Sequence, residues 1–68
     1  MWKNGMTNGF LWEAKVYDEG SVFGINGGRV SKLHVCKDHR DVYCYDRGLI
    51  FDEAPAGLID VILKDATK

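Results

Sequence analysis

The chain has no long hydrophobic run. Among its 68 residues no apolar stretch approaches the roughly 20 residues that a membrane-spanning helix needs. The first residues, Trp2, Lys3 and Asn4, also lack the apolar core of a secretory signal peptide. We therefore expect no membrane partner and a location in the cytoplasm.

The chain also lacks a strong excess of either charge. Nine Lys and Arg stand against ten Asp and Glu, which gives a formal net charge of −1. Positive charges are slightly enriched in the middle third, and negative charges in the last third. Proteins that bind nucleic acid through electrostatics normally carry a clustered basic surface. On charge alone, a nucleic-acid partner is not expected.

Cysteine is scarce, and the two present do not form a recognisable metal motif. Zinc sites usually draw their ligands in close pairs such as Cys-x-x-Cys, whereas the spacing of His34, Cys36, His39 and Cys44 follows no such pattern. A reducing cytoplasm also disfavours a disulfide. We expect free cysteines and no bound metal, and we treat a two-Cys, two-His site as the weaker alternative.

Catalytic motifs are absent as well. No Ser/His/Asp set, paired carboxylates or Cys/His dyad occurs with a specific spacing. The glycine-rich segment around Gly27 lacks the Gly-Lys-Ser/Thr of a phosphate-binding P-loop. We expect a protein that is not an enzyme and that uses no cofactor.

The short length predicts one domain with a small core. A chain of this size buries only about 60% of the surface that its unfolded form exposes, so its stability is marginal. Binding of a partner, or self-association, adds stability by mass action. We therefore expect a homo-oligomer, with a dimer favoured.

Strand and turn signals dominate the first two thirds of the sequence. Asn8-Gly9 predicts a hairpin turn after a short first segment, because Asn and Gly tolerate the positive φ angles of tight turns. From Phe10 to Tyr17 polar and apolar residues alternate, which is typical of a half-buried strand with Phe10, Trp12, Ala14 and Val16 on one side.

A second hairpin is predicted around Asn26-Gly27-Gly28. By the same turn chemistry, this segment would join a short strand, Val22–Ile25, to a strand over residues 29–37. The strand 29–37 would place Ser31, Leu33 and Val35 on one face, and Val30, Lys32, His34 and Cys36 on the other.

The next connection, residues 38–41, contains no glycine and predicts a four-residue loop on a type I turn, which needs no positive φ. Lys37 then pairs with Val42, Cys36 with Tyr43 and His34 with Tyr45. This register points Cys36 and Cys44 to opposite faces. It yields an aliphatic face and an amphipathic, aromatic face, the latter made of Lys32, His34, Cys36, Tyr43, Tyr45 and Arg47. Gly48 is expected to end the strand, with residues 49–51 leading away from it.

The last segment predicts an amphipathic helix. Its apolar residues recur at three- and four-residue spacing and comprise Ala56, Leu58, Ile59, Ile62, Leu63 and Ala66. Pro55 suits the first turn of such a helix, and Gly57 weakens it by roughly 1 kcal/mol relative to alanine. We expect an α+β fold: an antiparallel sheet of about four strands, covered on its aliphatic face by this helix.

Two motifs carry a resemblance to a family. They are Gly24-Ile25-Asn26-Gly27-Gly28-Arg29-Val30-Ser31-Lys32-Leu33 and Tyr45-Asp46-Arg47-Gly48, with Trp2 and Gly5 upstream. Together they resemble a group of small uncharacterised proteins of bacteria and their phages. The resemblance covers most of residues 1–48 and fades over the helix. It implies no catalytic residues, and Leu49-Ile50 departs from the Trp-Asp pair expected after the second motif.

The expected function is stoichiometric binding to a host protein. A protein this small in a phage or mobile element acts by occupying a surface, for example that of a bacterial defence or regulatory protein, which it would inhibit. Tyr and Arg supply large contacts at interfaces, so the expected binding residues are Lys32, His34, Tyr43, Tyr45 and Arg47.

Two alternatives remain open. The first is a small ligand or nucleotide held by the turn Asn26, Gly27, Gly28 and Arg29, because glycine-rich backbone can present N–H groups to phosphate. The second is single-stranded nucleic acid stacked on the aromatic face.

Overall fold

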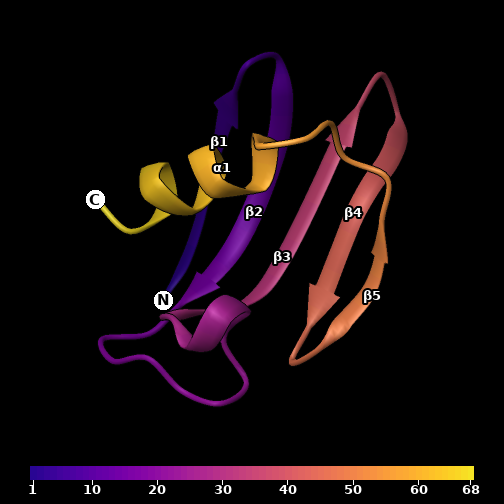
Figure 1. The fold of residues 1–68 in the computed structure, drawn as a ribbon. Coiled ribbons are helices and arrows are strands. Elements are labelled where there is room, and N and C mark those ends of the chain that lie inside the picture. Colours follow the sequence, from indigo (N-terminus) through magenta and orange to yellow (C-terminus); the bar gives the residue numbers. More distant parts are fainter.

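The computed structural model describes all 68 residues. It contains one five-stranded antiparallel sheet in the order β1-β2-β3-β4-β5 and one α-helix (Figure 1). The strands are β1 (Trp2–Thr7), β2 (Phe10–Val16), β3 (Val30–Lys37), β4 (Arg40–Asp46) and β5 (Leu49–Asp52), and the helix is α1 (Leu58–Ala66). The predicted α+β class is confirmed, with five strands rather than about four.

The β1–β2 hairpin forms as its turn residues predict. Asn8 and Gly9 have φ angles of 52° and 83°, which are the left-handed values that a two-residue hairpin turn requires. Thr7 pairs with Phe10, and the ladder continues to Trp2 opposite Lys15. Trp12, Ala14 and Val16 are buried on one side of β2, so the predicted alternation of this strand is confirmed.

The β3–β4 turn differs from the prediction, and the register differs with it. Asp38 and His39 alone form the turn, with φ angles of 52° and 65°, and Lys37 pairs with Arg40. Val42 is an extra residue in a β-bulge, so that Val35 pairs with Tyr43 and His34 with Cys44. The predicted four-residue loop and its register are therefore wrong by one residue over most of β4. A shift of one residue moves every side chain of a strand to the other face of the sheet.

The segment Val22–Ile25 is not a strand, and Asn26-Gly27-Gly28 is not a hairpin turn. Residues 17–29 instead form a long connection that ends in a short 3₁₀-helix, Ile25–Gly27. The connection folds tightly on itself, since a Cβ atom at Gly24 would overlap the carbonyl oxygen of Gly28. Gly20 and Gly24 are therefore needed for close backbone packing. Because β3 pairs directly with β2, no open edge remains between them for a further strand.

Strand β5 was not predicted. Tyr45 pairs with Leu49 and Cys44 with Phe51, so the segment after Gly48 turns back along β4 instead of leading away from it. Leu49 and Ile50 stay largely exposed at this edge of the sheet.

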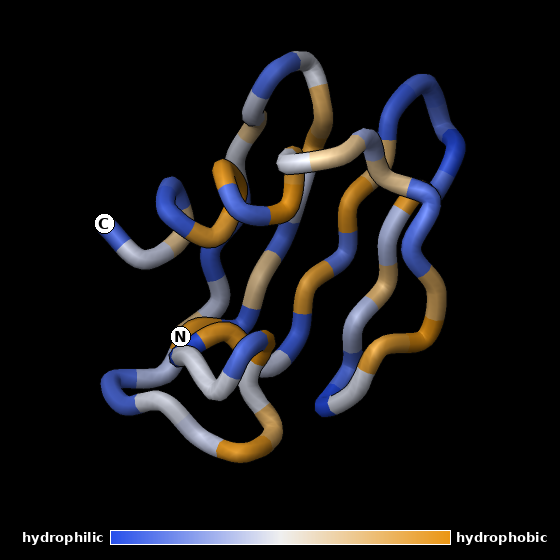
Figure 2. Tube along the Cα trace, in the orientation of Figure 1, coloured by the Kyte–Doolittle hydropathy of each residue, from blue (hydrophilic) through white to orange (hydrophobic).

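Helix α1 packs on the face of the sheet that carries Leu33 and Val35, as predicted. It lies against β1 and β2 (Figure 1), and its hydrophobic and hydrophilic residues alternate along the coil (Figure 2). One cluster of buried side chains links helix and sheet: Trp12, Ala14, Val16, Ile25, Val30, Leu33, Val35, Tyr43, Leu58, Ile62 and Ala66. The helix begins at Leu58, so Pro55 and Gly57 precede it, and Gly57 adopts a φ of 81°.

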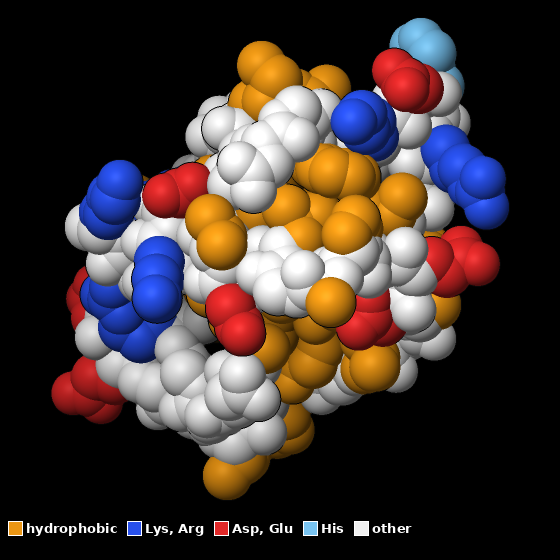
Figure 3. Space-filling view, turned by 45° about the horizontal axis from the view of Figure 1, so that its top comes forward, with side chains coloured by type: hydrophobic (Ala, Val, Ile, Leu, Met, Phe, Trp, Pro, Cys, Tyr) orange, Lys and Arg blue, Asp and Glu red, His pale blue; other side chains and the backbone are white.

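Hydrophobic side chains also reach the surface between α1 and the β4–β5 edge (Figure 3). Val42, Ala54 and Ile59 are partly buried against the core. No helix of the structure has the length and apolar character of a membrane span.

Candidate functional site

The observed register separates the residues predicted to bind a protein. Tyr43 pairs with Val35 on the helix side of the sheet and is only 4% exposed. Tyr45 shares that side, packs partly against the core and donates a hydrogen bond from its hydroxyl to the carbonyl oxygen of Phe23 (3.0 Å). Lys32 and His34 project from the opposite face. The expectation that these four residues form one surface is wrong, because the Val42 bulge moves both tyrosines toward the helix.

Lys32 and His34 are half-buried and each faces a carboxylate. The Nε2 atom of His34 lies 2.8 Å from Asp41 Oδ1, and the Nζ atom of Lys32 lies 3.7 Å from Asp46 Oδ1. Both pairs remain accessible to solvent on the carboxylate side, so they contribute little to folding stability.

The two cysteines are free and half-buried. Cys44 pairs with His34, and Cys36 lies two residues from His34 on the same strand, so both cysteines belong to the same face of the sheet. The prediction that they point to opposite faces is wrong for the same reason as the tyrosines. No three His, Cys, Asp or Glu side chains lie close enough to hold a metal ion.

In the Asn26–Arg29 turn, which the sequence offered as a ligand site, Arg29 has a structural role. A guanidinium nitrogen of Arg29, Nη2, donates a hydrogen bond to the carbonyl oxygen of Thr67 (2.7 Å) at the end of α1. Asn26 and Gly27 are exposed in the 3₁₀-helix, with left-handed φ angles. Arg29 therefore joins the connection to the helix C-terminus and does not extend toward a ligand at the turn.

One face of the sheet is left without a covering element. We call it the open face, and the pairing of β1 to β5 places on it Trp2, Asn4, Met6, Leu11, Glu13, Lys15, Lys32, His34, Cys36, Asp41, Cys44, Asp46 and Phe51. Its apolar side chains are prominent: Trp2 is 57% exposed, Met6 67% and Leu11 53%. The open face thus combines large apolar groups with charges of both signs.

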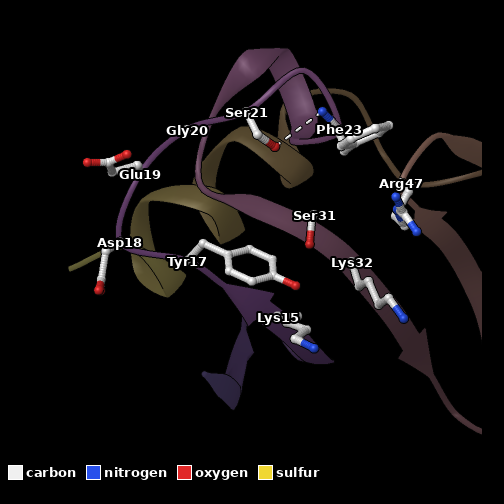
Figure 4. Close-up of a pocket in the computed structure, with 10 residues that line it drawn as sticks. All are labelled: Lys15, Tyr17, Asp18, Glu19, Gly20, Ser21, Phe23, Ser31, Lys32 and Arg47. Carbon is white, nitrogen blue, oxygen red and sulfur yellow. Dashed lines mark hydrogen bonds between the residues drawn. The ribbon is translucent and has the colours of Figure 1, made fainter.

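A cleft of about 870 Å³ lies at one end of the open face, between the β2–β3 connection and the β4–β5 turn. We call it the basic cleft (Figure 4), and its lining consists of Lys15, Tyr17, Asp18, Glu19, Gly20, Ser21, Phe23, Ser31, Lys32 and Arg47. This volume falls within the range of about 300–1,000 Å³ that is usual for small-molecule sites.

Charge is unevenly distributed in the basic cleft. Lys15, Lys32 and Arg47 lie toward one end, and the carboxylates of Asp18 and Glu19 lie toward the other (Figure 4). Neither Lys15 nor Arg47 takes part in an ion pair within the chain. The nearby Lys15 ammonium, more than any other group, lowers the pKa of Tyr17 below that of a free phenol.

Two of the cations lie over exposed aromatic rings. The guanidinium carbon of Arg47 is 4.6 Å from the centroid of the Phe23 ring, and the Nζ atom of Lys15 is 5.6 Å from that of Tyr17. Such cation–π contacts contribute about 0.5–1 kcal/mol each at exposed sites. They hold cationic and aromatic groups together at the mouth of the cleft.

Backbone hydrogen bonds fix both walls of the cleft. The amide of Tyr17 donates to the carbonyl oxygen of Arg29 (2.9 Å), and the amide of Arg47 donates to that of Ser31 (2.8 Å). Arg47 has a φ of 59°, which is uncommon for a residue with a Cβ atom and is retained only where the surroundings impose it. The cleft is therefore formed before any ligand binds.

The sequence interpretation proposed Lys32 and Arg47 as protein-binding residues, and the structure places both in the lining of the basic cleft. It did not identify Tyr17, Phe23 and Lys15 as their neighbours. The alternation of β2 already placed Lys15 and Tyr17 on one side of the strand. Their approach to Arg47 depends on the connection crossing beside the β4–β5 turn, and no local pattern signals that crossing.

The fold and its surfaces define a small α+β protein with an open sheet face and a preformed cleft. The chain belongs to a family described as a domain of unknown function (DUF7678), whose model matches residues 1–65. Searches of curated proteins and of solved structures find no match.

Proposed function

We propose that this protein has no catalytic activity and acts by binding another protein stoichiometrically through the open face. The observation that carries the proposal is the exposure of Trp2, Met6 and Leu11 on a sheet face that no helix covers. Monomeric proteins rarely leave a large apolar patch exposed, and such patches mark interaction surfaces.

The charges on the open face suit a different protein as the partner. Met6, Leu11 and Cys36 lie side by side across β1, β2 and β3, and we call them the apolar row. Glu13 separates this row from the Lys15–Lys32 cross-strand pair, beside which Trp2 lies. In this arrangement apolar contacts supply affinity, while the charged rows set the orientation of the partner. A partner that fits presents an apolar ridge flanked by groups of both charges.

The proposed setting is the cytoplasm of a bacterium. There the partner is a host protein, and this protein, encoded by a phage or mobile element, inhibits it, for example as part of an anti-defence system. The support for this setting is the resemblance carried by the segment from Gly24 to Leu33 and the motif from Tyr45 to Gly48. The family itself has no described function.

Capture from bacterial lysate by the tagged protein tests the proposal, followed by titration of the purified captured protein. Leu11→Asp places a charge in the middle of the apolar row and should abolish binding while leaving the melting temperature nearly unchanged. Val22→Asp is the matched control, because Val22 is 88% exposed and lies outside the open face. Equal loss of binding in both variants, or capture that Leu11→Asp leaves intact, would contradict the proposal.

A second copy of the chain is the alternative occupant of the open face. Sedimentation of the purified protein distinguishes the two occupants. A concentration-dependent dimer that Leu11→Asp dissociates assigns the face to self-association, and a monomer at all concentrations leaves it to a different protein.

A further inference from the structure

We propose that the basic cleft binds a nucleoside phosphate, with the phosphate at Lys15, Lys32 and Arg47 and the base against the ring of Phe23. This site shares Lys15 and Lys32 with the open face but includes neither Met6 nor Leu11, and it is separate from the Asn26–Arg29 turn. It does not depend on the proposed protein partner.

The cationic end of the cleft has the chemistry of a phosphate site. Lys15 and Arg47 have no carboxylate partner, and Lys32 shares one at 3.7 Å, which is longer than a hydrogen-bonded ion pair. Their positive charge is therefore available to a ligand. The phenol of Tyr17, whose pKa the Lys15 ammonium lowers, adds a hydroxyl donor at the same end (Figure 4).

The aromatic residues of the cleft provide a surface on which the base of the nucleotide can stack. Phe23 is 48% exposed and Tyr17 46%, so each ring offers apolar surface at the mouth of the cleft. Stacking of a base on an aromatic side chain contributes about 1–3 kcal/mol. A flat ring joined to a phosphate can therefore occupy the cationic and aromatic groups at once.

The acidic end of the cleft selects against a polyanion that fills its whole length. Asp18 and Glu19 line that end and would repel a second anionic group. Their carboxylates can accept hydrogen bonds from ribose hydroxyls or from base amino groups. A molecule with one anionic end and one end rich in donors matches this polarity, and a nucleoside phosphate is such a molecule.

The rigidity of the walls supports a binding role. Tyr45 holds the carbonyl oxygen of Phe23 through its hydroxyl (3.0 Å), and the amide of Phe23 donates to Ser21 Oγ (3.2 Å). The Phe23 ring is thus placed over Arg47 in the free protein. A site that needs no ordering on binding loses less conformational entropy.

Titration of the ¹⁵N-labelled full chain with AMP, GMP, CMP and UMP at low salt tests the proposal by two-dimensional NMR. At least one of these nucleotides should shift the amides of residues 15–19, Phe23, Lys32 and Arg47 in a saturable manner. Lys32→Gln and Arg47→Gln should each weaken that binding roughly tenfold, as expected for the loss of a charge-assisted hydrogen bond. Lys64→Gln, a change of an exposed cation on α1, is the control and should leave binding unchanged.

Phe23→Ala tests the stacking part, with Val22→Ala as its control. Phe23→Ala should weaken nucleotide binding but leave the response to inorganic phosphate unchanged. If inorganic phosphate binds as tightly as all four nucleotides, or if none of them gives a saturable shift up to about 1 mM, the weak limit of useful affinity, the proposal is wrong. Shifts confined to the apolar row of Met6 and Leu11 would also overturn it.

A parallel titration with oligo(dT) shows whether the ligand is a free nucleotide or the end of a single strand. Tighter binding of the oligonucleotide than of any mononucleotide, at the same residues and with a steep salt dependence, assigns the cleft to a single-strand terminus. Equal or weaker binding assigns it to a free nucleotide. Leu11→Asp, which tests the protein-binding proposal, should leave nucleotide binding intact, so failure of one proposal is distinguishable from failure of the other.

Discussion

Trp12, Thr7 and Asp65 form a chain of side-chain hydrogen bonds that joins the sheet to α1. Trp12 Nε1 donates to Thr7 Oγ1 (2.9 Å), and Thr7 Oγ1 donates to Asp65 Oδ2 (2.6 Å). Thr7 is only 6% exposed, so its hydroxyl is the polar group that makes burial of the indole N–H tolerable. A buried donor without an acceptor costs about 1–3 kcal/mol.

Thr7→Val should therefore destabilise the fold by about 1–3 kcal/mol, because it leaves Trp12 Nε1 without an acceptor. Urea denaturation measures this loss. Thr7→Ser keeps the hydroxyl and is the matched variant, which should retain most of the stability. Equal stability of the Val and Ser variants would show that the hydrogen bonds contribute nothing.

The same contacts predict a dependence on acid pH. The hydrogen bond from the Thr7 hydroxyl, followed by the contact with Lys68, lowers the pKa of Asp65 below the usual value of an aspartate. A depressed folded-state pKa gives a stabilisation that is present above the unfolded pKa and is lost as the pH falls through the folded pKa. The difference in unfolding free energy between wild type and Asp65→Asn should thus shrink below about pH 4. A difference that stays constant down to pH 2 would contradict this assignment.

Tyr43 predicts a dependence on alkaline pH. Burial, assisted by the negative charge of Asp52, raises the pKa of Tyr43 to about 12 from 10.0. The neutral phenol is the form compatible with the folded state, so the associated stability is complete below pH 10 and is lost as the pH rises toward 12. Tyr43→Phe should match wild type within about 0.5 kcal/mol at pH 7 and lose less stability between pH 10 and 12. Parallel pH profiles would refute this.

At the scale of single elements, the β3–β4 turn has an unfavourable backbone conformation. Asp38 and His39 both adopt positive φ angles, which Asn and Gly tolerate far better. The tip of this hairpin is hydrophilic throughout (Figure 2), so no packing compensates for the conformation. The pairing of β3 with β4 imposes it.

Replacement of both turn residues, Asp38→Asn with His39→Gly, should stabilise the protein by roughly 1 kcal/mol, since it removes the strain at positive φ. Thermal denaturation measures the gain. His39→Ala retains a Cβ atom and should give no gain. Destabilisation by the Asn-Gly turn would show that a side-chain contact of Asp38 or His39 matters more than the backbone.

The β2–β3 connection depends on Gly24. A Cβ atom there overlaps the Gly28 carbonyl group, so Gly24→Ala must displace backbone on one side of the cleft. At Gly48, by contrast, a Cβ atom would meet nothing within 4 Å. Gly24→Ala should cost about 1–3 kcal/mol and impair ligand binding, whereas Gly48→Ala should do neither. Denaturation and the nucleotide titration together check this pair.

At the scale of the whole molecule, stability depends on one small core between α1 and the sheet. Ile62 is completely buried, and its neighbour Val61 is 41% exposed. Ile62→Ala should cost about 2–5 kcal/mol, a large share of the 5–15 kcal/mol typical of folded domains. Val61→Ala should stay within about 0.5 kcal/mol of wild type. Similar losses of unfolding free energy in the two variants would show that Ile62 is not part of the core.

Both proposed binding surfaces lie on the side of the sheet opposite the hydrophobic core. The core lies on the helix side of the sheet, whereas the apolar row and the basic cleft both lie away from α1. Substitutions at either surface can therefore change binding without unfolding the chain. This separation makes the binding experiments interpretable as tests of function.

Local patterns were sufficient to predict several elements. The alternation from Phe10 to Val16, the Asn8-Gly9 turn and the helical spacing around Ile62 each reflect interactions between residues close in sequence. Backbone periodicity and turn chemistry act over that range, so these elements and the α+β class followed from the sequence. The proposal of Lys32 and Arg47 as protein-binding residues rested on their type and on a predicted face, and it stays a prediction.

Long-range pairing determined the rest. The side of the sheet that Tyr43 and Tyr45 face depends on the bulge at Val42 and on a turn whose residues do not favour it. The basic cleft forms because the β2–β3 connection is pinned beside Arg47 by hydrogen bonds between segments distant in sequence. These interactions are selected by the free energy of the assembled core, in which β3 needs partners on both sides. No local stretch of sequence determines which register is most stable, because the alternation of apolar and polar residues in one strand is compatible with more than one register.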